Sequence, residues 1–128
     1  TQTGRSPVLN LVAQAEDLSS DCKSLIEITA ELDIQRDWFT DRALDHASAR
    51  QYPVETLVSL FLFQHARELS TTELTDWLIA RGETRRFNLP RAPSPQLLSR
   101  VWQHEFSHTD RAVIRRAALH FRFIHDFD

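Results

Sequence analysis

The stretch that most constrains the fold is Pro53–Glu68, PVETLVSLFLFQHARE, because its apolar residues point in every direction around a helical wheel. A helix without a single apolar stripe is satisfied only when it is buried on all sides. Proline suits the first position of such a helix, where its missing N–H would be unpaired in any case. The uninterrupted apolar run Leu60–Phe63 is far shorter than the roughly 20 residues that cross a bilayer. We therefore expect a central helix with amphipathic helices packed around it, and no membrane contact.

Length and composition favour one all-α domain. The chain has 128 residues, 41% of them hydrophobic, which is enough for a single core. Only two residues are glycine, and strand-type alternation is scarce, so hairpins are not expected. We predict a compact bundle of about six helices spanning 1–128, with a lead-in at 1–52, a core at 53–106 and a final helix at 107–128.

The cysteine and methionine content indicates the cellular compartment and whether the sequence is part of a longer protein. The single cysteine, Cys22, excludes an internal disulfide, and no charged segment followed by an apolar run resembles a signal peptide. We therefore expect a cytoplasmic protein. Methionine is absent, and the sequence stops soon after the apolar run Phe121–Ile124. We therefore expect a piece of a longer protein, and we take it to be the N-terminal part.

Charge is distributed unevenly along the chain. Residues 1–80 carry six Lys and Arg against thirteen Asp and Glu, whereas residues 81–128 carry nine Arg against five acids. A basic surface on one side can attract phosphates even when the whole chain is mildly acidic. The alternative is that these arginines are ordinary solvated side chains on helix faces.

Apolar spacing predicts further helices around the central one. They are expected at 7–18, 22–32, 38–47 and from 109 or 110 to about 124. Residues 1–50 show no pattern that suggests chemistry. The inward positions expected to centre the core are Leu57, Phe61, Leu74, Leu78, Leu98 and Trp102.

A strong helix start follows the central helix at Leu69–Leu74, LSTTEL. The Ser70 side chain can accept a hydrogen bond from the Glu73 N–H while Glu73 reaches back to the Ser70 N–H. Gly82 is placed to end this helix in a left-handed turn. We predict a helix over 70–81.

The next helix is expected over 94–106, after a basic connection at 83–93. Ser94 and Pro95 supply its cap and its first position. At about 100° per residue, its outward face carries no carboxylate and consists of Gln96, Ser99, Arg100, Gln103 and Ser107.

That outward face suggests recognition of DNA. An α-helix fits the major groove, where Arg can bind guanine and Gln adenine through paired hydrogen bonds. The helices over 70–81 and 94–106 would then form a helix-turn-helix-like pair with a long connection. The candidates for base contact are Gln96, Ser99, Arg100 and Gln103, and those for phosphate contact are Arg85, Arg86, Arg91 and Arg115.

Four short motifs also follow one another at the spacing of a known family: YPVETLVSLFL at 52–62, ELSTTEL at 68–74, RFNLP at 86–90 and SPQLLSR at 94–100. Together they resemble the amino-terminal domain of InsH-like insertion-sequence transposases over about 53–106. The resemblance implies a helical module that binds transposon-end DNA or dimerises. It also implies that an RNase H-like catalytic domain, with three acidic residues and divalent metal, follows in the parent protein. We expect no catalytic residue and no cofactor in these 128 residues.

A second motif, HEFSH at 104–108, matches the H-E-x-x-H pattern of zinc hydrolases. On one continuous helix His104 and His108 would share one side and could bind zinc, with Glu105 as the general base. Ser107 is a capping residue, so we expect the helix to end inside the motif. The histidines are then expected to cap or pack, and no metal site is predicted.

The expected function is that of a non-catalytic DNA-binding or dimerisation domain of an insertion-sequence transposase. DNA at transposon ends is the expected partner, and homodimerisation is left open. The alternatives are a helical protein-interaction or regulatory module without a nucleic-acid role, and a zinc-dependent hydrolase that uses the HEFSH motif. The DNA-binding domain requires salt-sensitive DNA binding, the protein-interaction module requires no DNA binding, and the zinc hydrolase requires bound metal.

Overall fold

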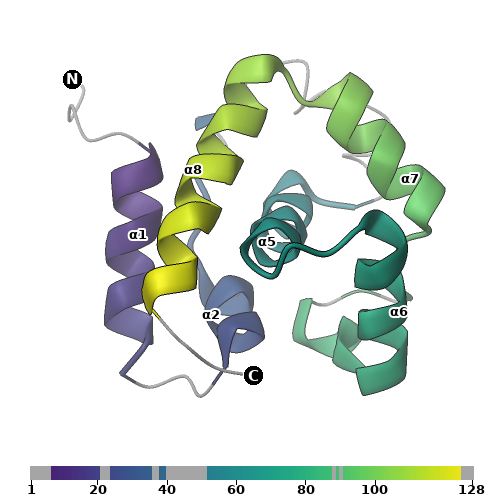
Figure 1. The fold of residues 1–128 in the computed structure, drawn as a ribbon, viewed down its shortest axis with the longest axis horizontal. Helices are drawn as coiled ribbons and strands as arrows, with labels where there is room; N and C mark the ends of the chain where they lie inside the picture. The colour runs from purple at the N-terminus through teal and green to yellow at the C-terminus, as the bar shows by residue number, and fades with distance from the viewer. Residues whose placement is uncertain are drawn as a thin grey trace.

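The regular structure in the described part of the chain is helical. The computed structural model describes residues 7–20, 24–35, 38–39, 52–87, 89 and 91–124, and no strand occurs among them. The prediction of an all-α bundle is confirmed. Six α-helices lie within these ranges and are labelled as in Figure 1: α1 (Pro7–Leu18), α2 (Leu25–Glu31), α5 (Val54–Ala66), α6 (Thr71–Arg81), α7 (Pro95–Arg100) and α8 (His108–Ile124).

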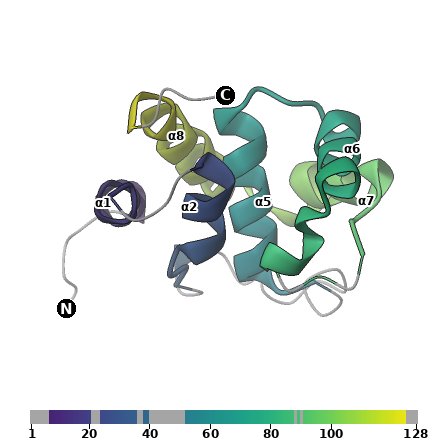
Figure 2. The ribbon, with the colours of Figure 1, turned by 90° about the horizontal axis from the view of Figure 1, so that it is seen from below.

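Helix α5 forms the centre of the fold, as its apolar composition predicted. Ten of its thirteen residues are buried. Figure 1 looks along α5 and shows α1, α2 and α8 on one side of it and α6 and α7 on the other. Figure 2 shows α1 at the outer edge, with α2 and α8 lying between it and α5. None of the helices in the described ranges is both long and apolar enough to span a membrane.

The first half of the chain follows the prediction only in part. Helix α1 has the predicted bounds. Helix α2 ends one residue before the predicted range 22–32 because Leu32 adopts an extended conformation, and it begins after the cap residue Ser24, while 22 and 23 lie outside the described residues. The backbone of the next residue, Asp33, then pairs with the Gln14 side chain, which accepts from its N–H at 2.7 Å and donates to its C=O at 3.0 Å. Of the helix predicted at 38–47, all but the first two residues lie outside the described part.

The caps of α6 match the prediction. Glu73 N–H donates to Ser70 Oγ at 3.1 Å, and Ser70 N–H donates to Glu73 Oε1 at 2.8 Å. The helix ends at Gly82, which has a φ of 63°. Glycine suits this left-handed turn because it has no Cβ to oppose it. The connection to α7 begins with a short 3-10 helix at Glu83–Phe87.

The helix predicted over 94–106 is not a uniform α-helix. Helix α7 starts at the expected Ser94 cap, whose Oγ accepts from Leu97 N–H at 3.1 Å, but its α geometry ends at Arg100. Residues Val101–Glu105 continue as a π turn, closed by a hydrogen bond from Phe106 N–H to Val101 C=O at 3.1 Å. A separate helix, α8, then begins at His108.

Packing of Phe106 explains why the helix stops there. Phe106 is extended, and its ring lies 5.6 Å from the ring of Phe61 in α5 and 6.3 Å from that of Phe39. The next residue, Ser107, accepts a hydrogen bond from Asp110 N–H at 3.1 Å, while Asp110 Oδ2 accepts from Ser107 N–H at 3.1 Å. These reciprocal bonds start α8. The local capping signal and the long-range aromatic contact therefore favour the same break.

Five of the six predicted central residues are fully buried. Trp102 is the exception, because it is only half-buried. Its ring packs against Phe61 at 5.0 Å and against the ring of His65 at 4.5 Å. The expectation that Trp102 lies at the centre of the core is wrong, and Trp102 instead closes the core at its edge. The buried residues are Leu57, Phe61, Leu74, Leu78 and Leu98.

Substitution of the central aromatic side chain tests this arrangement. Phe61→Ala should lower the free energy of unfolding by about 3–5 kcal/mol, since it removes a ring that contacts both Trp102 and Phe106. Ile79→Ala is the matched control, because Ile79 is 65% exposed on α6. Chemical denaturation measures both changes. A loss below about 1 kcal/mol for Phe61→Ala would show that α5 is not the centre of the core.

Candidate nucleic-acid interface

An exposed groove of about 470 Å³ runs along α7 and the π turn, next to the start of α6. It brings together all four residues predicted to contact bases. Among the described residues that line it, none is acidic. The groove therefore presents hydrogen-bonding groups and one guanidinium to a ligand. Its lining consists of Thr71, Pro95, Gln96, Ser99, Arg100, Gln103 and His104.

A buried contact between α6 and the segment before α7 fixes the wall of the groove. Thr75 is buried in α6, and its Oγ1 donates to the C=O of Pro93 at 2.9 Å. Leu74 of α6 and Leu98 of α7 are also fully buried. The two helices thus pack as a pair, although a 3-10 helix and a loop replace the short turn of a helix-turn-helix.

The π turn places a buried carboxylate beside Arg100. Glu105 is only 3% exposed, and its Oε2 lies 3.7 Å from Nε of Arg100. Reasoning from the sequence gave Glu105 a role only in the zinc motif. Its burial could have been predicted from the sequence, because Glu105 lies four residues after Val101 and seven after Leu98, on the apolar stripe of the helix.

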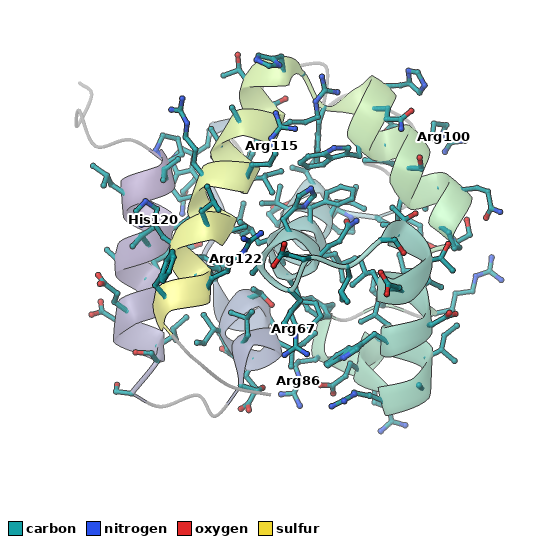
Figure 3. All side chains as sticks on the ribbon, viewed as in Figure 1. Arg67, Arg86, Arg100, Arg115, His120 and Arg122 are labelled. Atoms are coloured by element: carbon teal, nitrogen blue, oxygen red, sulfur yellow. The ribbon has the colours of Figure 1, made fainter. Side chains whose placement is uncertain are left out.

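The phosphate candidates of the connection lie outside this groove. Arg85 and Arg86 are exposed on the 3-10 helix after α6, and Arg86 Nε lies 3.3 Å from Glu83 Oε2. Figure 3 places Arg86 at the opposite end of the view from Arg100. Arg91 is exposed and lines a separate hollow. A ligand that meets the groove and these arginines together must extend along α6.

Arginines of α8 hold the preceding segments in place. Arg111 donates from Nη1 to the C=O groups of Trp102 at 3.0 Å, Gln103 at 3.1 Å and Phe106 at 3.3 Å. These contacts satisfy carbonyl groups at the end of a helical segment, where positive charge is favourable. Part of the basic character of the C-terminal third therefore has a structural role.

Two further arginines of α8, Arg115 and Arg122, lie near His65. The guanidinium of Arg115 lies 5.9 Å from the centre of the Trp102 ring. Arg122 donates from Nη2 to the C=O of His65 at 2.9 Å, and its Nη1 lies 3.8 Å from Glu68 Oε2. Arg122 thus caps the end of α5. The predicted phosphate candidate Arg115 is exposed and lies over the Trp102 ring, and Figure 3 shows it on α8, separated from Arg100 on α7.

His65 lies against the Trp102 ring near these arginines. Burial lowers the pKa of His65 below its ordinary value of 6.5, and the positive charges of Arg115 and Arg122 lower it further. A hydrogen bond to the C=O of Phe61 at 2.9 Å partly opposes this shift. The neutral imidazole with its proton on Nδ1 is therefore the form that fits the fold.

The HEFSH segment does not form one continuous helix. His104 belongs to the π turn, whereas His108 is the first residue of α8, and Glu105 is buried toward Arg100. The expectation that the helix ends inside this motif is confirmed. Zinc hydrolases need both histidines on the same side of one helix. Within the described ranges, no three His, Cys, Asp or Glu side chains are grouped so that they could hold a metal ion.

Because its pKa is lowered by folding, His65 should make stability depend on pH. The unfolded chain binds a proton on this residue more readily than the folded chain does, so its contribution to stability is present above pH 6.5. It is lost as the pH falls from 6.5 through the lowered pKa. Denaturation of wild type and His65→Gln between neutral and mildly acidic pH should show a smaller loss in the variant.

His120→Gln is the matched control for this measurement, since it removes an exposed histidine of α8. Figure 3 places His120 on the side of α8 that faces α1, whereas Arg115 and Arg122 lie on the other side of this helix. If His65→Gln and wild type lose the same stability on acidification, His65 does not couple protonation to folding.

Comparison with protein-family models, curated proteins and solved structures found no match to this chain. The family likeness of 53–106 therefore stays a resemblance. The groove and its surroundings are the features of the described residues that indicate a function.

Proposed function

We propose that the chain is a DNA-binding module, and that the groove along α7 and the π turn is its contact surface. The observation that carries the proposal is the joint position of the four predicted base-contact residues on one exposed surface. They come from successive turns of a single segment. The described lining of that surface includes no acidic residue, although the chain as a whole has a net charge of −3.

The chemistry of the groove suits base edges. Gln can pair with both hydrogen-bonding atoms of adenine, and Arg can do the same with guanine. Gln96, Arg100 and Gln103 are exposed, and Ser99 between them is half-buried. These side chains extend from a helical segment of a size that the major groove admits.

The surrounding charge argues for modest affinity. The acidic first eighty residues repel phosphates, and two arginines of α8, Arg111 and Arg122, are engaged within the fold. Contacts from Arg85, Arg86 and Arg91 would extend the interface along the connection after α6. Two copies on one DNA would double the contacts and raise the apparent affinity. The resemblance to transposases suggests transposon ends as the DNA and places catalysis in another part of the parent protein.

Substitution of Gln103 tests the proposed surface. A duplex enriched from a random library by the wild-type protein serves as the ligand. Gln103→Ala should weaken binding to it by about 1–3 kcal/mol and relax the preference at one base pair. Gln35→Ala is the matched control, because Gln35 is an exposed glutamine after α2. Equal effects of the two substitutions would rule out the groove as the contact surface.

The same titration separates base contacts from phosphate contacts. Arg86→Ala should weaken binding to all sequences alike and lower the slope of log affinity against log salt by about one. A complete lack of salt-dependent binding by wild type at low ionic strength would contradict the DNA-binding proposal itself.

The outer face of α8 favours protein interaction as a second candidate function. Leu119 and Phe123 are 50% and 86% exposed and lie four residues apart, so they share one face of the helix. Exposed Arg115 and Arg116 flank them. Large apolar side chains in water are typical of surfaces that bind protein, including a second copy of the same chain.

Sedimentation at several concentrations tests whether this face forms a homodimer. Phe123→Ser should abolish any self-association, because it removes the most exposed aromatic ring of the described residues. Ile79→Ser, on the exposed side of α6, is the matched control. If self-association survives Phe123→Ser, this face does not mediate it.

A further inference from the structure

We infer that Glu105 is a positioning residue that orients Arg100 in the groove for a base edge, with guanine as the expected ligand. The inference rests on the proposed DNA-binding function and extends it to the origin of sequence preference. It starts from an unusual combination, since a buried carboxylate sits directly behind an exposed arginine of the candidate interface.

The π turn is what brings the two side chains together. In an α-helix, residues five apart point about 140° away from each other, at 100° per residue. In a π turn the backbone hydrogen bonds join residues five apart, as Phe106 N–H and Val101 C=O do here. Residues with that separation then lie on the same side, and Arg100 and Glu105 have it.

Burial is unequal between the two partners. The side chain of Glu105 is 5% exposed, whereas that of Arg100 is 59% exposed. The carboxylate is therefore held by the packed interior, and the longer arginine side chain reaches over it toward solvent. Such a fixed carboxylate restricts the guanidinium to fewer orientations. A restricted guanidinium loses less conformational entropy when it binds.

The charge of Glu105 should also change what Arg100 prefers to bind. A nearby carboxylate offsets part of the positive charge that attracts phosphates at any sequence. The planar fork of the guanidinium remains suited to the paired acceptors of guanine. Glu105 should therefore lower affinity for DNA in general while raising discrimination between sequences. A residue that only stabilises the fold would not change these two quantities in opposite directions.

Glu105→Gln tests the inference with little change in shape. The probes are a duplex enriched from a random library by wild type and a scrambled duplex of equal length. The variant should bind the scrambled duplex about twofold more tightly, and the ratio of the two affinities should fall about tenfold. Glu83→Gln is the matched control, because Glu83 pairs with Arg86 outside the groove, and it should leave the ratio unchanged.

Two further variants keep the test decisive if Glu105→Gln is unstable. Arg100→Lys retains the charge but lacks the fork, so the affinity ratio should fall about as far as in Glu105→Gln. Combining Glu105→Gln with Arg100→Ala should lower the ratio no further than Arg100→Ala alone, because both act on one contact. Unfolding curves of each variant show which losses arise from the fold.

The possible failures are distinguishable. If wild type binds both duplexes with a clear preference and Glu105→Gln leaves the ratio unchanged, the positioning role is wrong and the DNA-binding function stands. A parallel fall in both affinities, matched by lost stability, would make Glu105 a structural residue only. If wild type binds neither duplex at low salt, the proposed function fails and the inference fails with it.

Discussion

Burial of α5 on all sides is the constraint on which the rest of the structure depends. A helix that carries apolar residues around its whole circumference is stable in water only when other helices cover it completely. The remaining helices meet that requirement from two sides, with α2 and α8 on one and α6 and α7 on the other. The rings of Trp102 and Phe106 join α5 through Phe61. The segment that forms the groove therefore packs directly against the central helix.

The arginines of the C-terminal third have two different roles. Arg111 and Arg122 donate to carbonyl groups at the ends of the π turn and of α5, which makes them part of the fold. Arg100 extends from the groove with a carboxylate behind it. A count of basic residues in this part of the sequence therefore overstates the charge that is presented to a partner. The proposal of a DNA surface rests instead on the absence of acids from the described lining of the groove.

The sequence predicted the features that depend on near neighbours. The capping box at Ser70 and the left-handed turn at Gly82 use residues within one helical turn, and the all-round burial of α5 follows from its composition. The residues of the groove could be grouped because most of them repeat at helical spacing. Their contact with DNA stays a prediction.

The differences arise where distant residues decide the local conformation. Helix α2 ends early as the backbone of Asp33 pairs with Gln14 of α1, which no local pattern reveals. The α geometry of α7 gives way to a π turn where Phe106 reaches Phe39 and Phe61. The partnership of Arg100 with Glu105 depends on that turn. It could not be foreseen from α-helical spacing, although the acidic residue in an apolar stripe marked the position.

Backbone NMR during a DNA titration decides whether DNA binds along α7 and the π turn. A ¹⁵N-labelled chain is titrated at low salt with a duplex selected from a random library. We expect the largest amide shifts at Gln96, Ser99, Arg100 and Gln103, with smaller shifts at the start of α6. Shifts centred on Leu119 and Phe123 of α8, or no shifts at any residue, would contradict DNA binding along α7 and the π turn.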